Sequence, residues 1–395
     1  MMKYIFCLAL LPAFSAAGNA QNRPLDEADL LRAVEQHSPA LQSAAETARA
    51  GRIEARTGNS LPDPELGYTR QWGSSGAAVQ DEFTASQGFD FPTAYVQRGR
   101  AARAKEQAAD AAYRELRMES LLQVRLAVQQ VLYLKKRILV DSLRLEDALF
   151  AQRMALRRAE AGDITAIEEN RIAFQTLSAR NNLTRTRMAL ETALTGLSSL
   201  SGLPLSAETE ILPMPVPELA PLEQVLSDAY VADPGLSGAR AAGQAALEER
   251  RLAVSMALPK FNAGYKYSSS DGLKFNGVTA GMSLPLFESR NTVKLARARQ
   301  AEAEASARAL ETSLTADLTA KYSQARRLEA MYGAYRRNGE SAGKSVLLRK
   351  ALDAGSLTIL EYFTELDSVY RNMDEMNELT FNYRSLRIEL GKYSL

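Results

Sequence analysis

Few side chains in this sequence have the types and spacing that catalysis or metal binding requires. The chain of 395 residues contains one histidine, His37, and one cysteine, Cys7. A single histidine removes most histidine-dependent catalysis and any multi-histidine metal site. No glycine-rich phosphate loop or nucleophile constellation is present, and the nearest acidic pair, Asp63 and Glu65, lies where a helix is expected to give way to a strand. We therefore predict that the chain is not an enzyme and uses no cofactor.

The first twenty residues have the pattern of a secretory signal peptide. Lys3 precedes an apolar run, 4–14, and small residues follow at 18–20. We assign residues 1–20 to this signal and exclude them from the fold. Cys7 lies inside it, so the mature chain is expected to have no disulfide and no thiolate metal site.

Net charge and the distribution of apolar residues exclude further classes of protein. The 48 basic and 47 acidic residues give a net charge of +1, which provides no bulk attraction to nucleic acid. Met373 and Met376 could offer soft metal ligands, but methionines at helical spacing more often pack, so no metal site is predicted. No apolar run after residue 20 is long enough for a transmembrane helix. If this chain crosses a membrane, it does so with strands.

The elements that must position any functional residue are very long helices. From Arg98 to Glu160 there is no proline and no glycine after Gly99, which predicts one helix of about 95 Å. Its apolar stripe comprises Leu121, Val124, Val128, Val131, Ile138, Leu145 and Leu149. The opposite face is expected to be charged, with Arg125, Lys135, Lys136 and Arg144. A reversal at Gly162 returns the chain in a shorter arm, 164–200.

The whole pattern occurs twice. The matched positions are Pro39 and Pro234, 195 residues apart; Pro62 and Pro259, 197 apart; Pro92 and Pro285, 193 apart; and Gly162 and Gly355, 193 apart. Four anchors in the same order predict a tandem internal repeat. We expect a first repeat over 21–203, a proline-rich linker over 204–222 and a second repeat over 223–395.

Each repeat changes from helical to strand periodicity before its long arm. Apolar and small or polar residues alternate over 65–91 and again over 260–285, which predicts two hairpins of about ten residues per strand. That length suits a tilted strand in an outer-membrane barrel. The alternative is a pair of soluble hairpins packed on the helices. Long helical hairpins, 97–200 and 288–390, follow the two strand pairs.

Four strands cannot close a membrane barrel, and open edges are not tolerated in lipid. The barrel must be shared: two chains would supply eight strands and three chains twelve, and a water-filled lumen favours the larger number. The returning arms cover only part of the long arms. The short helices that begin at Pro39 and Pro234 would fill the remainder, giving a hollow cylinder below the barrel.

Over essentially its whole mature length the chain resembles the TolC-type outer membrane efflux proteins. The resemblance is carried by the duplication, the proline-opened helices at Pro39 and Pro234, the two hairpins, and the reversals at Gly162 and Gly355. It implies a mixed, mostly α fold: a homotrimer whose periplasmic α-barrel joins a shared 12-stranded β-barrel in the outer membrane. The implied function is the outer membrane channel of a tripartite efflux or type I secretion system, a passive duct that works with a periplasmic adaptor and an inner-membrane pump.

The resemblance also implies which residues form the functional tip. The adaptor-facing turns would comprise Gly162, Asp163 and Thr165, together with Gly355, Ser356 and Thr358. An acidic residue commonly lines the constriction just after the second turn, and Glu361 occupies that position; Thr364 stands where a second acid is common, and Glu365 follows it. Three Glu361 carboxylates around one axis would raise each other's pKa and attract cations. The alternative is a solvated helical face, and Glu168 is the repeat equivalent.

A rival function uses the same helices without lipid. A secreted coiled-coil structural or adhesive protein would need long amphipathic helices but no lipid-facing strands. The exported substrate is not encoded here, since its selection would belong to the inner-membrane pump.

Overall fold

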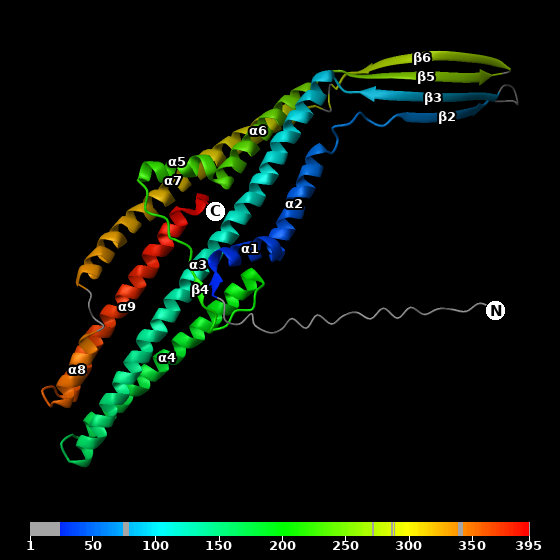
Figure 1. The fold of residues 1–395 in the computed structure, drawn as a ribbon. Helices are drawn as coiled ribbons and strands as arrows, with labels where there is room; N and C mark the ends of the chain where they lie inside the picture. The colour runs from blue at the N-terminus through cyan, green and yellow to red at the C-terminus, as the bar shows by residue number, and fades with distance from the viewer. Residues whose placement is uncertain are drawn as a thin grey trace, which may run out of the picture.

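The computed structural model describes residues 24–73, 79–270, 272–285, 287, 289–338 and 343–394. The predicted signal peptide, 1–20, lies outside them. The described chain is strongly elongated, with a flat strand assembly at one end and helical turns at the other (Figure 1). Among the described residues, none of the helices combines the length and the apolar content that a membrane span requires.

Nine α-helices carry most of the described chain. They are α1 (Glu27–His37), α2 (Pro39–Arg56), α3 (Pro92–Glu160), α4 (Ala166–Ser201), α5 (Leu222–Ala232), α6 (Pro234–Met256), α7 (Thr292–Asn338), α8 (Lys344–Asp353) and α9 (Ile359–Leu390), with a 3-10 turn at Lys392–Ser394. The strands are β1 (Leu25–Asp26), β2 (Glu65–Trp72), β3 (Val79–Phe89), β4 (Ile211–Leu212), β5 (Lys260–Ser270) and β6 (Leu273–Ser283).

The long first arm predicted from the sequence is confirmed as one continuous helix. Helix α3 has 69 residues, about 100 Å, and starts six residues before the predicted Arg98 because Pro92 occupies its first turn, where a missing N–H costs nothing. It ends at Ala161, followed by Gly162 at φ +79°. Helix α4 returns beside it and stops at Gly202, whose φ of +70° is a conformation that glycine adopts without strain.

Proline-opened helices start where the sequence places them. The Ser38 hydroxyl accepts a hydrogen bond from the Leu41 N–H at the start of α2, and the Asp233 carboxylate does the same for Leu236 at the start of α6. Helix α2 lies along α3 above the end of α4, and α6 lies between α3 and α7 (Figure 1). The short helices therefore occupy the length that the returning arms leave open.

The second long arm is described as two helices. Helix α7 ends at Asn338 and α8 starts after Gly343, which offers no side-chain cap. Gly339 and Gly343 both lie in this stretch of sequence, and glycine disfavours helix relative to alanine by about 1 kcal/mol. Elements otherwise follow one another in the same order in both halves; the tandem duplication itself stays a prediction.

The two predicted hairpins are confirmed, and they join into one sheet with the order β2-β3-β5-β6, antiparallel throughout. Its register aligns Leu66 with Ala85, Tyr265 and Val278 across the four strands. Most apolar residues of the four strands therefore gather on one face, while the other face carries glycines, serines and threonines together with Leu273 and Phe275 of β6. The apolar face is open: Leu66 is 73% exposed and Val278 90% exposed.

The helical core forms three clusters along the shaft instead of one central core. The first lies between α1, α3 and α4, the second near the turns between α3, α4, α8 and α9, and the third between α5, α7 and α9. Each helix is thus buried on one stripe only, which suits the wall of a larger assembly.

One prediction about the α3 surface is wrong. Arg125 was expected on the solvent-facing side, but it is 3% exposed. Its Nε donates to Oε1 of the fully buried Glu27 at 2.8 Å, and its second nitrogen donates to the Pro215 carbonyl at 3.2 Å. The other Glu27 oxygen accepts the Met214 N–H at 2.6 Å. The first residue of α1 and the linker therefore cover this stretch of α3 and neutralise its charge.

Candidate functional site at the helical tip

Both predicted reversals lie at the end of the molecule opposite the sheet (Figure 1). Gly162 and Gly355 adopt φ values of +79° and +73°, the left-handed conformation that closes a helix and that glycine tolerates best. The Asp163 N–H then donates to the Arg158 carbonyl at 2.8 Å, and the Ser356 N–H to the Ala351 carbonyl at 2.9 Å. The two turns therefore share one geometry.

The residue that follows each turn starts the next helix with a capping box. The Glu361 carboxylate accepts hydrogen bonds from the Thr358 N–H and hydroxyl, both at 2.8 Å, while the Thr358 hydroxyl accepts the Glu361 N–H at 3.2 Å. Thr165 and Glu168 repeat this arrangement at 2.8, 3.0 and 3.2 Å. Glu361 therefore has a structural partner within its own chain.

This contact affects the charge of Glu361. Hydrogen bonds from the Thr358 backbone and then its side chain lower the pKa of the Glu361 carboxyl below its ordinary value, and Thr165 does the same for Glu168. The mutual repulsion predicted for a ring of Glu361 carboxylates would raise the pKa. The contacts within one chain act in the opposite direction and keep the group ionised.

The three predicted constriction residues share one exposed face of α9. Glu361, Thr364 and Glu365 are spaced three and four residues apart, as neighbours on a helix surface are, and all three are exposed. The Thr364 hydroxyl donates to the Leu360 carbonyl at 3.0 Å. The six turn residues of the predicted adaptor-facing surface are exposed as well.

A buried polar cluster just above the tip was not predicted. Asp147 on α3, with its side chain 1% exposed, accepts hydrogen bonds from three side chains of α8 and α9. The donors are Nε of Arg349 and the phenols of Tyr370 and Tyr362, the last at 3.3 Å. Burial, together with the neighbouring Asp147 charge, raises the pKa of both phenols, which therefore stay protonated as donors.

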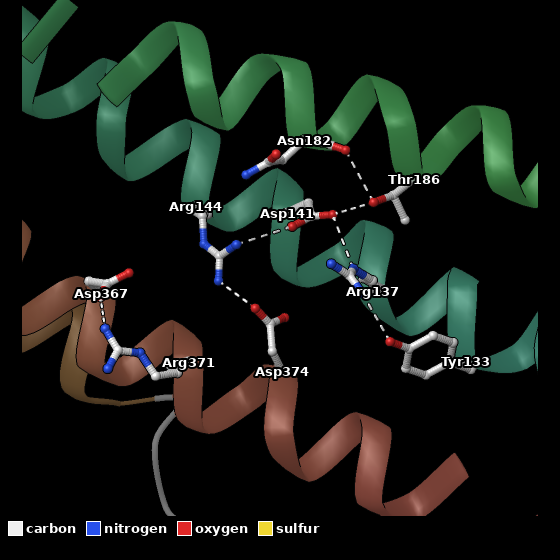
Figure 2. Close-up of polar contacts among 9 residues, drawn as sticks. All are labelled: Tyr133, Arg137, Asp141, Arg144, Asn182, Thr186, Asp367, Arg371 and Asp374. Atoms are coloured by element: carbon white, nitrogen blue, oxygen red, sulfur yellow. Dashed lines mark hydrogen bonds and ion pairs between the residues drawn. The ribbon is translucent and has the colours of Figure 1, made fainter. Parts of the chain in front are cut away.

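A second cluster of polar side chains lies about one helical turn before Asp147 in α3, on the side away from the tip (Figure 2). Arg144 donates to Asp374 of α9 at 2.7 Å and to Asp141 at 3.5 Å. The other Asp141 oxygen accepts the hydroxyl of Thr186 from α4 at 2.6 Å. We name Asp141, Arg144 and Asp147 the polar ladder, because their spacing of three residues places them along one side of α3, where they reach α4, α8 and α9.

One feature of the sequence indicates the polar ladder: its charged residues alternate with apolar residues on the side of α3 that is buried. Arg144 was assigned to the charged outer face of the arm, yet it is only partly exposed and its guanidinium lies 5.1 Å from the Tyr370 ring centre. Charged residues interleaved with Val140, Ala148 and Ala151 on the buried side of a helix need partners from other helices. Three of those partners, Arg349, Tyr370 and Asp374, lie more than 200 residues away along the chain.

The described residues include no group of three or more His, Cys, Asp or Glu side chains placed to hold a metal ion. The contacts described at the tip are helix turns, capping boxes and buried ion pairs, and they fix the positions of the helices.

Comparison with solved structures places this architecture among outer membrane channel proteins. VceC, an outer membrane protein of Vibrio cholerae, matches with a TM-score of 0.77 and 16% identity over 92% of this chain and 94% of its own. The CmeC outer membrane channel of Campylobacter jejuni matches with 0.73 and 14%, over 99% and 93%. CusC, described in terms of transmembrane channel formation, matches with 0.76 and 14%, over 96% and 95%. The TM-scores establish a shared fold, and at these low identities the comparison shows the fold alone.

Part of the sequence also matches a family model. Residues 225–393 match the family model described as outer membrane efflux protein. This match covers the second half of the chain, and together with the shared fold it confirms the resemblance predicted from the sequence. A comparison with curated protein sequences finds no match.

Proposed function

We propose that three copies of this chain form the outer membrane duct of an efflux or secretion system. Each copy would contribute four strands to a shared twelve-stranded barrel and its helices to a hollow shaft in the periplasm. The family match over 225–393 and the fold shared with CmeC, an outer membrane channel, support this function. In this proposal the duct is passive and provides only a path for the substrate.

The observation that carries the proposal is the sheet. Its outer strands, β2 and β6, each pair on one side only among the described residues, which leaves two rows of free backbone groups. Its apolar face is exposed, with Trp72 73% and Val278 90% exposed on the two edge strands. Neither feature suits a soluble monomer, and closure with neighbouring copies in lipid satisfies both. The rival coiled-coil protein provides no use for such strands.

The helical end also exposes apolar side chains that a neighbouring copy would cover. Helix α4 packs on α3, and α8 packs on α9, so α4 and α8 form opposite outer sides of the tip. Ile167 and Phe174 on α4 are 80% and 70% exposed, and Leu347 on α8 is 66% exposed. We place the α4 side of one copy against the α8 side of the next, which would bury these side chains and close the ring.

The tip would then act as the gate and the docking end. The turns at Gly162 and Gly355 face the periplasmic adaptor, through which an inner-membrane pump delivers substrate. The exposed α9 face with Glu361, Thr364 and Glu365 lines the constriction. The polar ladder holds α8 and α9 against α3, so a wider opening requires its buried hydrogen bonds to break or shift.

Disulfide cross-linking tests the shared barrel directly, because the single cysteine, Cys7, lies in the predicted signal peptide. Thr69→Cys at the middle of β2 is combined in turn with Gly277→Cys, Thr279→Cys and Gly281→Cys on the same face of β6. At the correct register, oxidation of the detergent-purified protein yields a covalent trimer on non-reducing gels, and the parent protein conducts ions in planar bilayers. Thr69→Cys alone yields no trimer. A monomer that never cross-links through its edges, with no conductance, would contradict the proposal.

A further inference from the structure

A pocket of about 380 Å³ lies between the linker and α9, in the middle of the molecule and away from both the sheet and the tip. It is lined by Pro213, Met214, Pro215, Val216, Tyr332, Thr380, Tyr383, Arg384 and Arg387. The linker crosses the helices beside the C-terminal end of α9 (Figure 1). No predicted role of this chain uses these residues.

Contacts among the lining residues hold the linker and two tyrosine rings in place at the pocket. Arg387 fixes the linker, since its Nε donates to the Pro217 carbonyl at 2.6 Å and its Nη2 to the Val216 carbonyl at 3.2 Å. The rings of Tyr332 and Tyr383 stack at 5.9 Å with an angle of 27° between them. The Arg387 guanidinium lies 5.2 Å from the centre of the Tyr383 ring. The pocket thus brings linker prolines and two tyrosine rings together, and a flat ring packs well against both types of side chain.

The charge at the pocket is not compensated. Arg384 has no hydrogen bond or ion pair in the described part of the chain, and Arg387 uses only two of its nitrogens there. Lys136 of α3 lies close enough to interact with Arg384: burial and then the nearby Arg384 charge lower the pKa of Lys136. Glu329 contacts the pocket residue Tyr383, whose phenol donates to it at 3.2 Å. Its carboxylate already pairs with Arg326 at 2.6 Å.

We propose that this pocket binds an oxyanion, a phosphate or carboxylate, carried on a flat ring. Arg384 and the free nitrogen of Arg387 would bind the anion, for which guanidinium groups have the matching donor geometry. The ring would lie against Tyr332 and the prolines of the linker. Two adjacent cations without a counter-ion beside an apolar slot are a costly arrangement for a purely structural surface, and a bound anion removes that cost. The site is independent of the proposed channel function.

Isothermal titration of the full-length protein in detergent tests this site with phenyl phosphate and inorganic phosphate. We expect phenyl phosphate to bind at least tenfold more tightly than inorganic phosphate, and Tyr332→Leu to abolish that preference. Arg384→Gln should weaken phenyl phosphate binding at least tenfold. Arg180→Gln, the same change at an exposed position of α4 far from the pocket, should leave it unchanged.

Two results would overturn the inference: no binding of phenyl phosphate by the parent protein, or equal binding by the parent and Arg384→Gln. Should Arg384→Gln fail to fold, Lys136→Gln takes its place, because Lys136 lies on the surface of α3 and has no partner that its loss would leave unpaired. Weakening of at least threefold by Lys136→Gln supports the site, and no weakening overturns it.

Discussion

The phenol of Tyr370 on α9 donates a hydrogen bond to Oδ2 of Asp147 on α3, and both side chains are buried although they lie 223 residues apart in the sequence. Tyr362 and Arg349 donate to the other carboxylate oxygen. A buried carboxylate that loses its donors is strongly destabilised, so the three donors hold α8 and α9 in one position against α3. The Asp147 cluster therefore fixes α8 and α9 relative to α3 at the tip.

Removing one donor should loosen the tip. Tyr370→Phe deletes the phenol and keeps the ring that packs near Arg144. A hydrogen bond to a charged group contributes about 1.5–3 kcal/mol, so we expect easier dilation, seen as a severalfold higher single-channel conductance in planar bilayers. Tyr113→Phe, where the phenol has no partner among the described residues, should conduct like the parent. Equal conductance of Tyr370→Phe and the parent would show that the Asp147 cluster does not restrain the gate.

The capping box at Thr358 makes the first turn of α9 sensitive to acid. Since the pKa of Glu361 is lowered, its contribution is present above the ordinary carboxyl pKa of about 4.3 and is lost as the pH falls through the lowered value. Thr358→Val removes the hydroxyl donor but keeps the backbone donor, so the pKa should move part of the way back up.

Hydrogen exchange of the amides in the first turn of α9, followed from pH 6 to pH 3, measures this shift. Protection in Thr358→Val should be lost at a higher pH than in the parent. Thr364→Val is the matched control, because the Thr364 hydroxyl bonds only to a carbonyl of its own helix. Identical pH profiles for Thr358→Val and the parent would mean that the cap does not set the charge of Glu361.

Regular elements of this fold could be predicted because their signals are local. The proline at the start of α3 and the glycine at +79° after it determine where the arm begins and reverses, whatever the rest of the chain does. The alternation in β2 and β6 likewise specifies a strand and its apolar face from neighbouring residues alone. The bounds of these elements accordingly agree with the predictions to within a few residues.

The buried polar contacts could not be predicted in that way. Whether Arg125 faces water depends on Glu27, which is 98 residues away along the chain and reaches it only because α1 packs on α3. Asp147 likewise depends on α8 and α9. A charge on a helix has the same sequence signature in both situations, so periodicity assigns it to the surface, where most charges lie. The partners of the charged residues that restrain the tip therefore become evident only in the folded chain.

The ion pair between Arg125 and Glu27 should contribute to stability only as a pair. Arg125→Met leaves Glu27 buried with one N–H donor, and breaking such a pair costs about 3–5 kcal/mol. We expect a large drop in the denaturant midpoint of the purified protein. The double change with Glu27→Met should recover part of the loss, since no buried charge remains. Arg326→Met, in an exposed pair with Glu329, should cost at most about 1 kcal/mol. A double variant no more stable than Arg125→Met would contradict this account.

Adjacent positions of β6 should respond in opposite ways to the same charge. Val278 is 90% exposed on the apolar face, and its neighbour Thr279 points to the face lined by Gly264 and other small residues. If the apolar face contacts lipid, Val278→Arg costs about 2–4 kcal/mol near the middle of the bilayer, while Thr279→Arg enters a water-filled lumen. We expect Val278→Arg to be depleted from the outer-membrane fraction by tenfold or more. Thr279→Arg should assemble normally but conduct less, with a shift toward anions, because its charge narrows the pore and repels cations. If both variants assemble equally well, the exposed face does not contact lipid.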